Sequence, residues 1–143
     1  MTIESQPVSS PHSSETIYSQ VSDLTHIDAL RPLLKDKQIE LQSIDADHCQ
    51  AEVHVMNFTA SLDLSVSERV PSQRVVYQIA HEMLPAEVTL TLRPLETSLT
   101  EIKVAMEAKV NPFMAGMIRP HLEQAVQQIA EALGRINYSE YGQ

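Results

Sequence analysis

The middle of the chain, from about residue 38 to 110, alternates apolar and polar side chains with a period of two. Ala51, Val53 and Val55, for example, alternate with Glu52 and His54. The same alternation recurs in four later segments, at residues 58–67, 75–79, 88–92 and 102–108. This pattern is typical of antiparallel strands with one face buried and one face in water. We therefore predict about six antiparallel strands in this region.

The first part of the chain has a different pattern. A short strand is predicted over residues 2–10, restricted to a sheet edge or a bulge by Pro7. The apolar residues after it recur at helical spacing and predict a first short helix with Ser10 as its cap. The segment 25–34 predicts a second short helix, which Pro32 limits.

The last segment, from about 112 to 136, predicts one long amphipathic helix, because its apolar residues fall at three- and four-residue steps. Asn111 can cap this helix, and Pro112 suits its first turn. Pro120 lies inside it, where its ring approaches the carbonyl of Gly116. We interpret Pro120 as a bend that lifts one half of the helix off the sheet. The alternative is that the helix only follows the curvature of the sheet.

These elements predict a single α+β domain over residues 1–143, with an ordered core from about 2 to 136. A twisted sheet must cover its apolar face, and the last helix is the long amphipathic element that is available to cover it. The sequence therefore predicts a curved antiparallel sheet that packs against a C-terminal helix.

Two stretches resemble the START/Bet v 1-like superfamily, also called SRPBCC or polyketide cyclase-like proteins. ETIYSQVSDLTHIDALRP, residues 15–32, is similar to the first helix, the serine–aspartate turn and the second helix of that family. VNPFMAGMIRPHLEQAVQQIAEAL, residues 110–133, resembles its methionine-rich entry to the last helix. The resemblance implies the helix-grip fold: about six to seven antiparallel strands, two short N-terminal helices and one long C-terminal helix across the sheet.

The resemblance also implies a cavity between sheet and helix that holds a small hydrophobic or amphipathic ligand. We therefore expect a carrier or sensor of a lipid, quinone or aromatic metabolite. Tyr77 and His81 share the parity of Val75 and Ile79, so they are expected to point towards the helix, whose apolar stripe carries His121. The predicted cavity-lining residues are Tyr77, Ile79, His81, Leu90, Val104, Met106, Met114, Met117, Ile118, His121, Leu122 and Ala125.

Two other functions stay open at this point. Tyr77, His81 or His121 could perform general acid–base work in an enzyme of the cyclase or hydratase kind, although no catalytic residue is assigned. The groove could instead accept a partner's helix or a second copy of the chain, which makes a homodimer an open alternative.

Composition narrows the list of partners. The formal charge of −9 would repel nucleic acid, and no basic run offsets it. The six histidines show no close helical pair typical of zinc sites, so we predict neither a metal nor another cofactor. Cys49 is expected to be a small core residue, and Asp45 and Asp47 to be turn formers. Without a signal peptide or a membrane-spanning run, a cytoplasmic location is expected.

Overall fold

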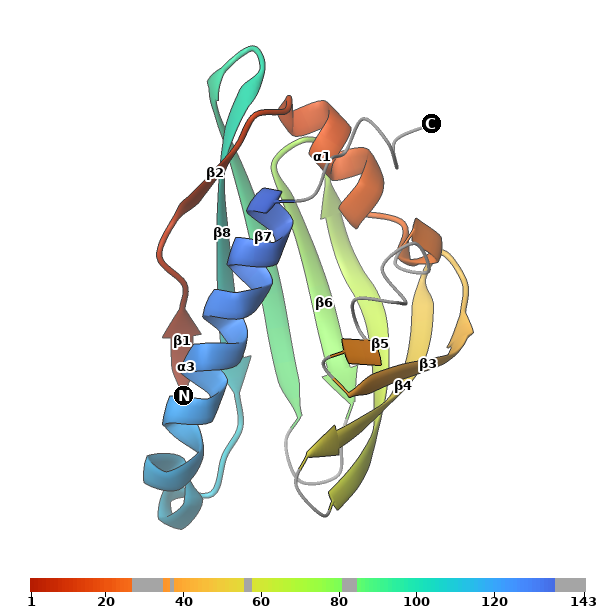
Figure 1. Cartoon of the computed structure of the whole chain (residues 1–143), viewed down its shortest axis with the longest axis vertical. Coiled ribbons are helices and arrows are strands. Elements are labelled where there is room, and N and C mark those ends of the chain that lie inside the picture. The colour runs from red at the N-terminus through yellow and green to blue at the C-terminus, as the bar shows by residue number, and fades with distance from the viewer. Residues whose placement is uncertain (27–34, 37, 56–57, 81–84, 136–143) are drawn as a thin grey trace.

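The computed structural model describes residues 1–26, 35–36, 38–55, 58–80 and 85–135. The described strands are β1 (Thr2–Glu4), β2 (Val8–Ser10), β3 (Ile39–Ile44), β4 (His48–Val55), β5 (Phe58–Val70), β6 (Arg74–Ala80), β7 (Ala86–Glu96) and β8 (Leu99–Ala108). They form one antiparallel sheet in the order β1-β8-β7-β6-β5-β4-β3, and β2 also pairs with β8. The described helices are α1 (Ser14–Val21) and α3 (Pro112–Arg135). Figure 1 shows the curved sheet with the long C-terminal helix against it, so the predicted α+β helix-grip class is confirmed.

The N-terminal segment departs from the prediction in its details. The single expected strand is divided into β1 and β2, which both pair with the edge of β8. Helix α1 is capped by Ser13, whose hydroxyl oxygen accepts a hydrogen bond from the Thr16 amide at 3.2 Å. The assignment of the cap to Ser10 is wrong, because Ser10 pairs with Thr100 as the last residue of β2. Most of the second predicted helix, residues 27–34, lies outside the described residues.

Helix α3 begins as the sequence predicts. The side-chain oxygen of Asn111 accepts a hydrogen bond from the Phe113 amide at 2.9 Å, so Asn111 caps the helix. The helix then continues through Pro120 to Arg135. A Cβ atom added at Gly116 would have no neighbour within 4 Å, so the helix is open on that side of Gly116. No described helix is long and apolar enough to cross a membrane.

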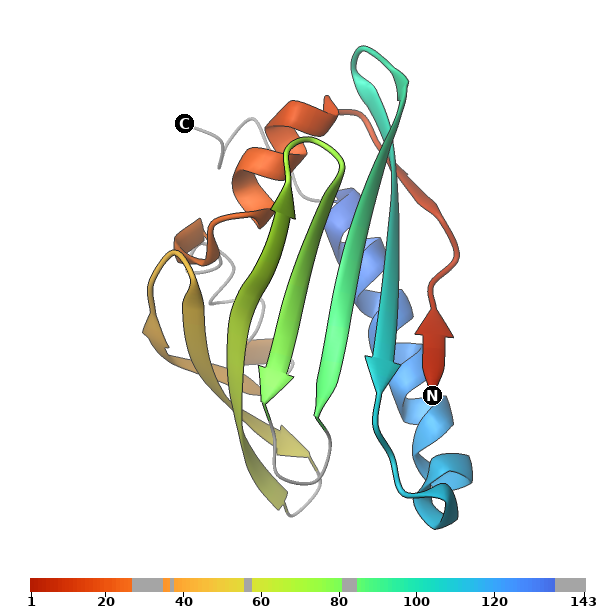
Figure 2. The same ribbon diagram turned by 180° about the vertical axis from the view of Figure 1, so that it is seen from behind.

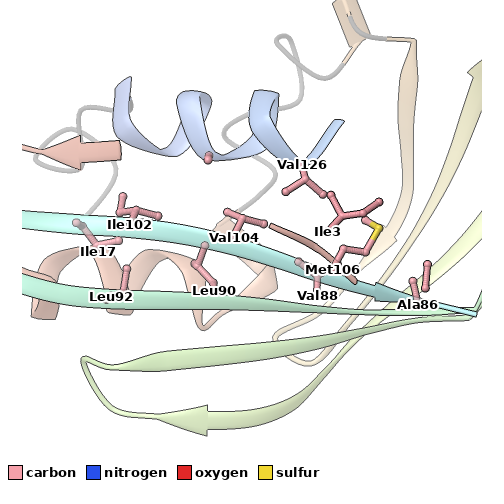
Figure 3. Packing of buried hydrophobic residues seen from close by; sticks show 12 residues of the cluster. Ile3, Ile17, Ala86, Val88, Leu90, Leu92, Ile102, Val104, Met106 and Val126 are labelled. Atoms are coloured by element: carbon pink, nitrogen blue, oxygen red, sulfur yellow. The ribbon is translucent and has the colours of Figure 1, made fainter. Parts of the chain in front are cut away.

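The main hydrophobic core lies between α3, α1 and the β1, β7 and β8 strands. Figure 3 shows Val126 pointing from α3 towards Ile3 and Met106. A second, smaller cluster consists of Leu24, Leu41 and Cys49. Cys49 is therefore a small core residue, as predicted. The members of the main cluster are Ile3, Ile17, Ala86, Val88, Leu90, Leu92, Ile102, Val104, Met106, Ala108, Val126 and Ala130.

The two described glycines of α3 lead to opposite expectations for alanine substitution. Gly116→Ala is expected to raise the free energy of unfolding by about 0.5–1 kcal/mol, because alanine loses less backbone entropy in a helix and meets no obstacle here. Gly134→Ala is expected to show no such gain, because the new Cβ would lie 3.3 Å from the Ser9 carbonyl oxygen and from Val8 Cγ2. Urea denaturation of both variants measures the difference.

The glycine pair also tests where α3 contacts the sheet. Equal stabilisation by both alanines would contradict the close approach of the helix C-terminal end to β2. Destabilisation by Gly116→Ala would contradict the open space beside the first half of the helix.

Candidate functional site

Helix α3 lies over one half of the sheet. It contacts β8, β2 and β1, whereas α1 contacts β7 and β6. Figure 1 shows α3 running along the β1 and β8 side, away from β3 and β4, and Figure 2 shows the same arrangement from behind. The face of the sheet that carries the main core therefore continues beyond the helix, across β6, β5 and β4.

The part of this face that α3 does not contact carries a continuous set of apolar side chains, which we call the inner apolar face. Strand pairing brings its members together: Val53 pairs with Ala60, and Leu64 with Ile79. All of them are half-buried, although they stand on the core side of the sheet. The inner apolar face consists of Ala51, Val53, Ala60, Leu62, Leu64, Val66 and Ile79.

Tyr77 stands at the boundary between the two clusters of buried residues. Its ring packs against both of them and is half-buried. Its hydroxyl donates a hydrogen bond to the carbonyl oxygen of Val21, the last residue of α1. Tyr77 thus points to the inner side, as its parity predicted, and ties β6 to the end of α1.

Arg69 adds a charged group on the same side of the sheet, because it pairs with the buried Val75. Its guanidinium donates hydrogen bonds to the carbonyl oxygens of Ser22 at 2.8 Å and Ala46 at 3.0 Å. It also forms an ion pair with Asp47, at 2.8 Å between Nη2 and Oδ1. The charge of Arg69 is therefore neutralised within the chain, and its contacts join the end of α1 to the turn before β4.

The turn before β4 is built on Asp45, as the sequence predicts. The Asp45 carboxylate accepts hydrogen bonds from the amides of Asp47 at 2.9 Å and His48 at 2.8 Å. These amides favour the ionised form, so they lower the pKa of Asp45 below its ordinary value of 3.8.

The lowered pKa of Asp45 predicts a pH-dependent contribution to stability. The ionised carboxylate stabilises the folded chain above pH 3.8, and this contribution is lost as the pH falls through the lower pKa of the folded state. Asp45→Asn is therefore expected to be less stable than the wild type at neutral pH and equally stable in strong acid. Urea denaturation across this pH range measures both curves. A stability gap that stays constant with pH would contradict the assignment.

The predicted cavity-lining residues fall into three groups. Leu90, Val104 and Met106 are buried in the main core. Met114 and Met117 are 43% and 77% exposed on the first half of α3, and His121 is also exposed. The residues on the boundary between core and solvent are Tyr77, Ile79, Ile118, Leu122 and Ala125, all half-buried. His81 lies outside the described residues.

The side of α3 that faces the core agrees only in part with the predicted stripe of apolar residues. Val126 and Ala130 are buried, and Leu122 and Leu133 pack against the same cluster. Met114 and Met117 stay exposed because the side of α3 that contacts the sheet is the one that carries Val126 and Ala130. The spacing of apolar residues along the helix could not by itself show that Val126 would be buried and Met117 exposed.

A hollow of about 310 Å³ lies on the opposite, outer face of the sheet, beside the bulge between Val66 and Glu68. It is lined by Ser67, Glu68, Arg74, Val76, Glu87 and Thr89. Arg74 and Glu68 form an ion pair within it. This hollow is polar and lies away from α3, so it differs in kind and place from the predicted ligand cavity.

A long helix against one half of a strongly curved antiparallel sheet is the START/Bet v 1-like fold, in agreement with the predicted resemblance. Norcoclaurine synthase from Thalictrum flavum is similar, with a TM-score of 0.70 and 13% sequence identity over 94% of this chain and 84% of that one. A START superfamily protein from Mycobacterium smegmatis has a TM-score of 0.58 and 18% identity, over 92% of this chain and 98% of that one. A conserved protein from Geobacillus kaustophilus has a TM-score of 0.66 and 12% identity, over 99% of this chain and 92% of that one.

These likenesses establish the fold and no individual site residue, because the identities are low. No protein-family model and no curated protein matches the sequence. One of the similar structures is a norcoclaurine synthase variant in complex with a transition-state analogue. The fold therefore accommodates both an enzyme and other START-like proteins, and the activity of this chain depends on its own residues.

Proposed function

We propose that the chain binds a small hydrophobic molecule against the inner apolar face, as a carrier or sensor. The observation that carries this proposal is a row of apolar side chains on the core side of β4, β5 and β6 that stay half-buried while α3 covers β1, β2 and β8. Apolar side chains that stay partly exposed on the core side of a sheet favour a ligand that removes them from water.

The charges around the inner apolar face favour an uncharged or weakly polar ligand. Among the described residues of β3 to β8 that face inwards, only Arg69 carries a charge. Its guanidinium already forms an ion pair with Asp47. The Tyr77 hydroxyl already donates a hydrogen bond to the carbonyl oxygen of Val21. A lipid, a quinone or an aromatic metabolite fits this chemistry better than a strongly charged ligand.

The direct test is native mass spectrometry of the protein isolated from its own host. We expect a stoichiometric complex that releases a small apolar molecule on extraction with organic solvent. An empty monomer would contradict constitutive carriage.

An interaction surface is the second candidate function, and the first half of α3 favours it. Phe113 is 91% exposed and lies close to the exposed Met114 and Met117. Such clustered apolar exposure is typical of contact surfaces between proteins. If the same mass spectra show a discrete dimer without a ligand, they would support a homodimer that forms through this surface. That result would count against the carrier function.

The enzyme alternative has less support. The Tyr77 hydroxyl would have to break its bond to Val21 before it could donate a proton to a substrate. His121 is exposed, and His81 lies outside the described residues. The absence of nucleic acid and of an organic cofactor as partners, and the cytoplasmic location, remain predictions from the sequence.

A further inference from the structure

Three potential metal ligands meet on the outer face of the sheet, opposite to the inner apolar face. Glu40 of β3 lies directly across from Glu52 of β4, and His54 follows two residues later on the same face. His54 Nε2 is 3.7 Å from Glu40 Oε2 and 3.8 Å from Glu52 Oε1. The three ligand atoms all lie within 4.8 Å of one another.

These separations are close to those that a zinc ion needs. Zinc binds histidine nitrogen and carboxylate oxygen at about 2.0–2.2 Å, so two ligands of a tetrahedral site are roughly 3.4 Å apart. Small side-chain rotations would bring the two carboxylates and the imidazole to that spacing. Three protein ligands leave one coordination position for water.

Two of the three side chains are also held by their far atoms. His54 Nδ1 is 3.1 Å from the hydroxyl of Thr59, its partner residue on β5. Glu52 Oε2 accepts a hydrogen bond from Gln42 at 2.6 Å, which leaves Oε1 directed towards His54. Such outer contacts orient the ligands of metal sites and keep the free imidazole nitrogen directed at the ion.

The paired carboxylates favour a cation between them. Like charges directly opposite one another on neighbouring strands are destabilising, and Glu40 and Glu52 are such a pair. We propose that Glu40, Glu52 and His54 bind a zinc ion. An imidazole with two carboxylates suits zinc, whereas magnesium prefers oxygen ligands alone.

The ion would join the edge strand β3 to β4 and so stabilise the end of the sheet. The proposal does not depend on the proposed ligand-binding function, because the site lies on the other face. It also reverses the expectation of no metal, which considered the spacing of histidines alone and not carboxylates from a neighbouring strand.

Isothermal titration of the tag-free protein with zinc chloride at neutral pH tests the site. The wild type is expected to bind one zinc ion per chain and to unfold at a higher temperature when zinc is bound. His54→Ala and Glu40→Gln are each expected to weaken binding at least about tenfold. Magnesium chloride is expected to give neither effect.

His48→Ala is the matched control, because His48 is also an exposed histidine of β4 but pairs with Asp45 outside the cluster. It is expected to bind zinc as tightly as the wild type. Thr59→Val, which removes the partner of the imidazole, is expected to weaken binding without touching a ligand. Absence of binding at millimolar zinc, or binding that His54→Ala leaves unchanged and therefore reflects an adventitious ion only, would overturn the proposal.

Discussion

Replacement of Ile102 by alanine is expected to lower the free energy of unfolding by about 2–5 kcal/mol. Ile102 is fully buried on β8, where it pairs with Leu92 of β7 on one side and with Val8 of β2 on the other. Figure 3 shows it beside Ile17 of α1. The smaller side chain would lose these contacts and leave a cavity where β2, β7, β8 and α1 meet. Urea denaturation of the variant and the wild type measures the loss.

Leu95→Ala provides the comparison for Ile102→Ala. Leu95 also lies in the β7–β8 region, but it is 41% exposed. Its truncation is expected to change the free energy of unfolding by less than about 0.5 kcal/mol. Similar losses in the two variants would show that β8 is not the centre of the core.

Introduction of a charge at Leu62 is expected to weaken the binding of an apolar ligand at least about tenfold, because a carboxylate placed against apolar atoms is costly to desolvate. Leu62 lies on β5 and pairs with Ala51 of β4, within the inner apolar face. The neutral fluorescent probe N-phenylnaphthylamine gives the measurement, since its emission rises when it leaves water. Leu62→Glu is expected to abolish most of that rise.

Leu95→Glu is the matched control for the probe experiment, since it adds the same charge at an exposed leucine outside the inner apolar face. It is expected to bind the probe as the wild type does. If Leu62→Glu does not fold, Ala60→Leu tests the same face by occupying space, and weaker binding is again expected. Unchanged binding by a folded Leu62→Glu would place the probe elsewhere and contradict the proposed site.

The strands are the part of the fold that the sequence predicted best. Val75, Tyr77 and Ile79 share one parity, and the structure places all three on the inner side of β6. The reason is local: a strand with one wet face must alternate, so the period itself records which face is buried. The start of α3 was predicted equally well, because the cap at Asn111 and the proline at Pro112 depend only on interactions within the first turn of the helix.

The candidate site was less readable, because it depends on how the elements meet. The apolar spacing of the last helix fits either of two overlapping stripes, and the structure turns Val126 inwards and Met117 outwards. The glutamate–histidine cluster was missed for a related reason. Glu52 and His54 share a face by parity, but only the pairing of β3 with β4 brings Glu40 to them.

The sequence by itself therefore determined the order of the strands and the presence of the long last helix. Periodicity, caps and turns depend on interactions within a few residues, so a short stretch of sequence contains them. The tertiary structure decided that α3 contacts β8, β2 and β1, and this leaves the inner apolar face half-buried. It also decided the strand register that places Glu40 opposite Glu52. Both outcomes depend on contacts between segments distant in the chain, whose energies no short stretch of sequence contains.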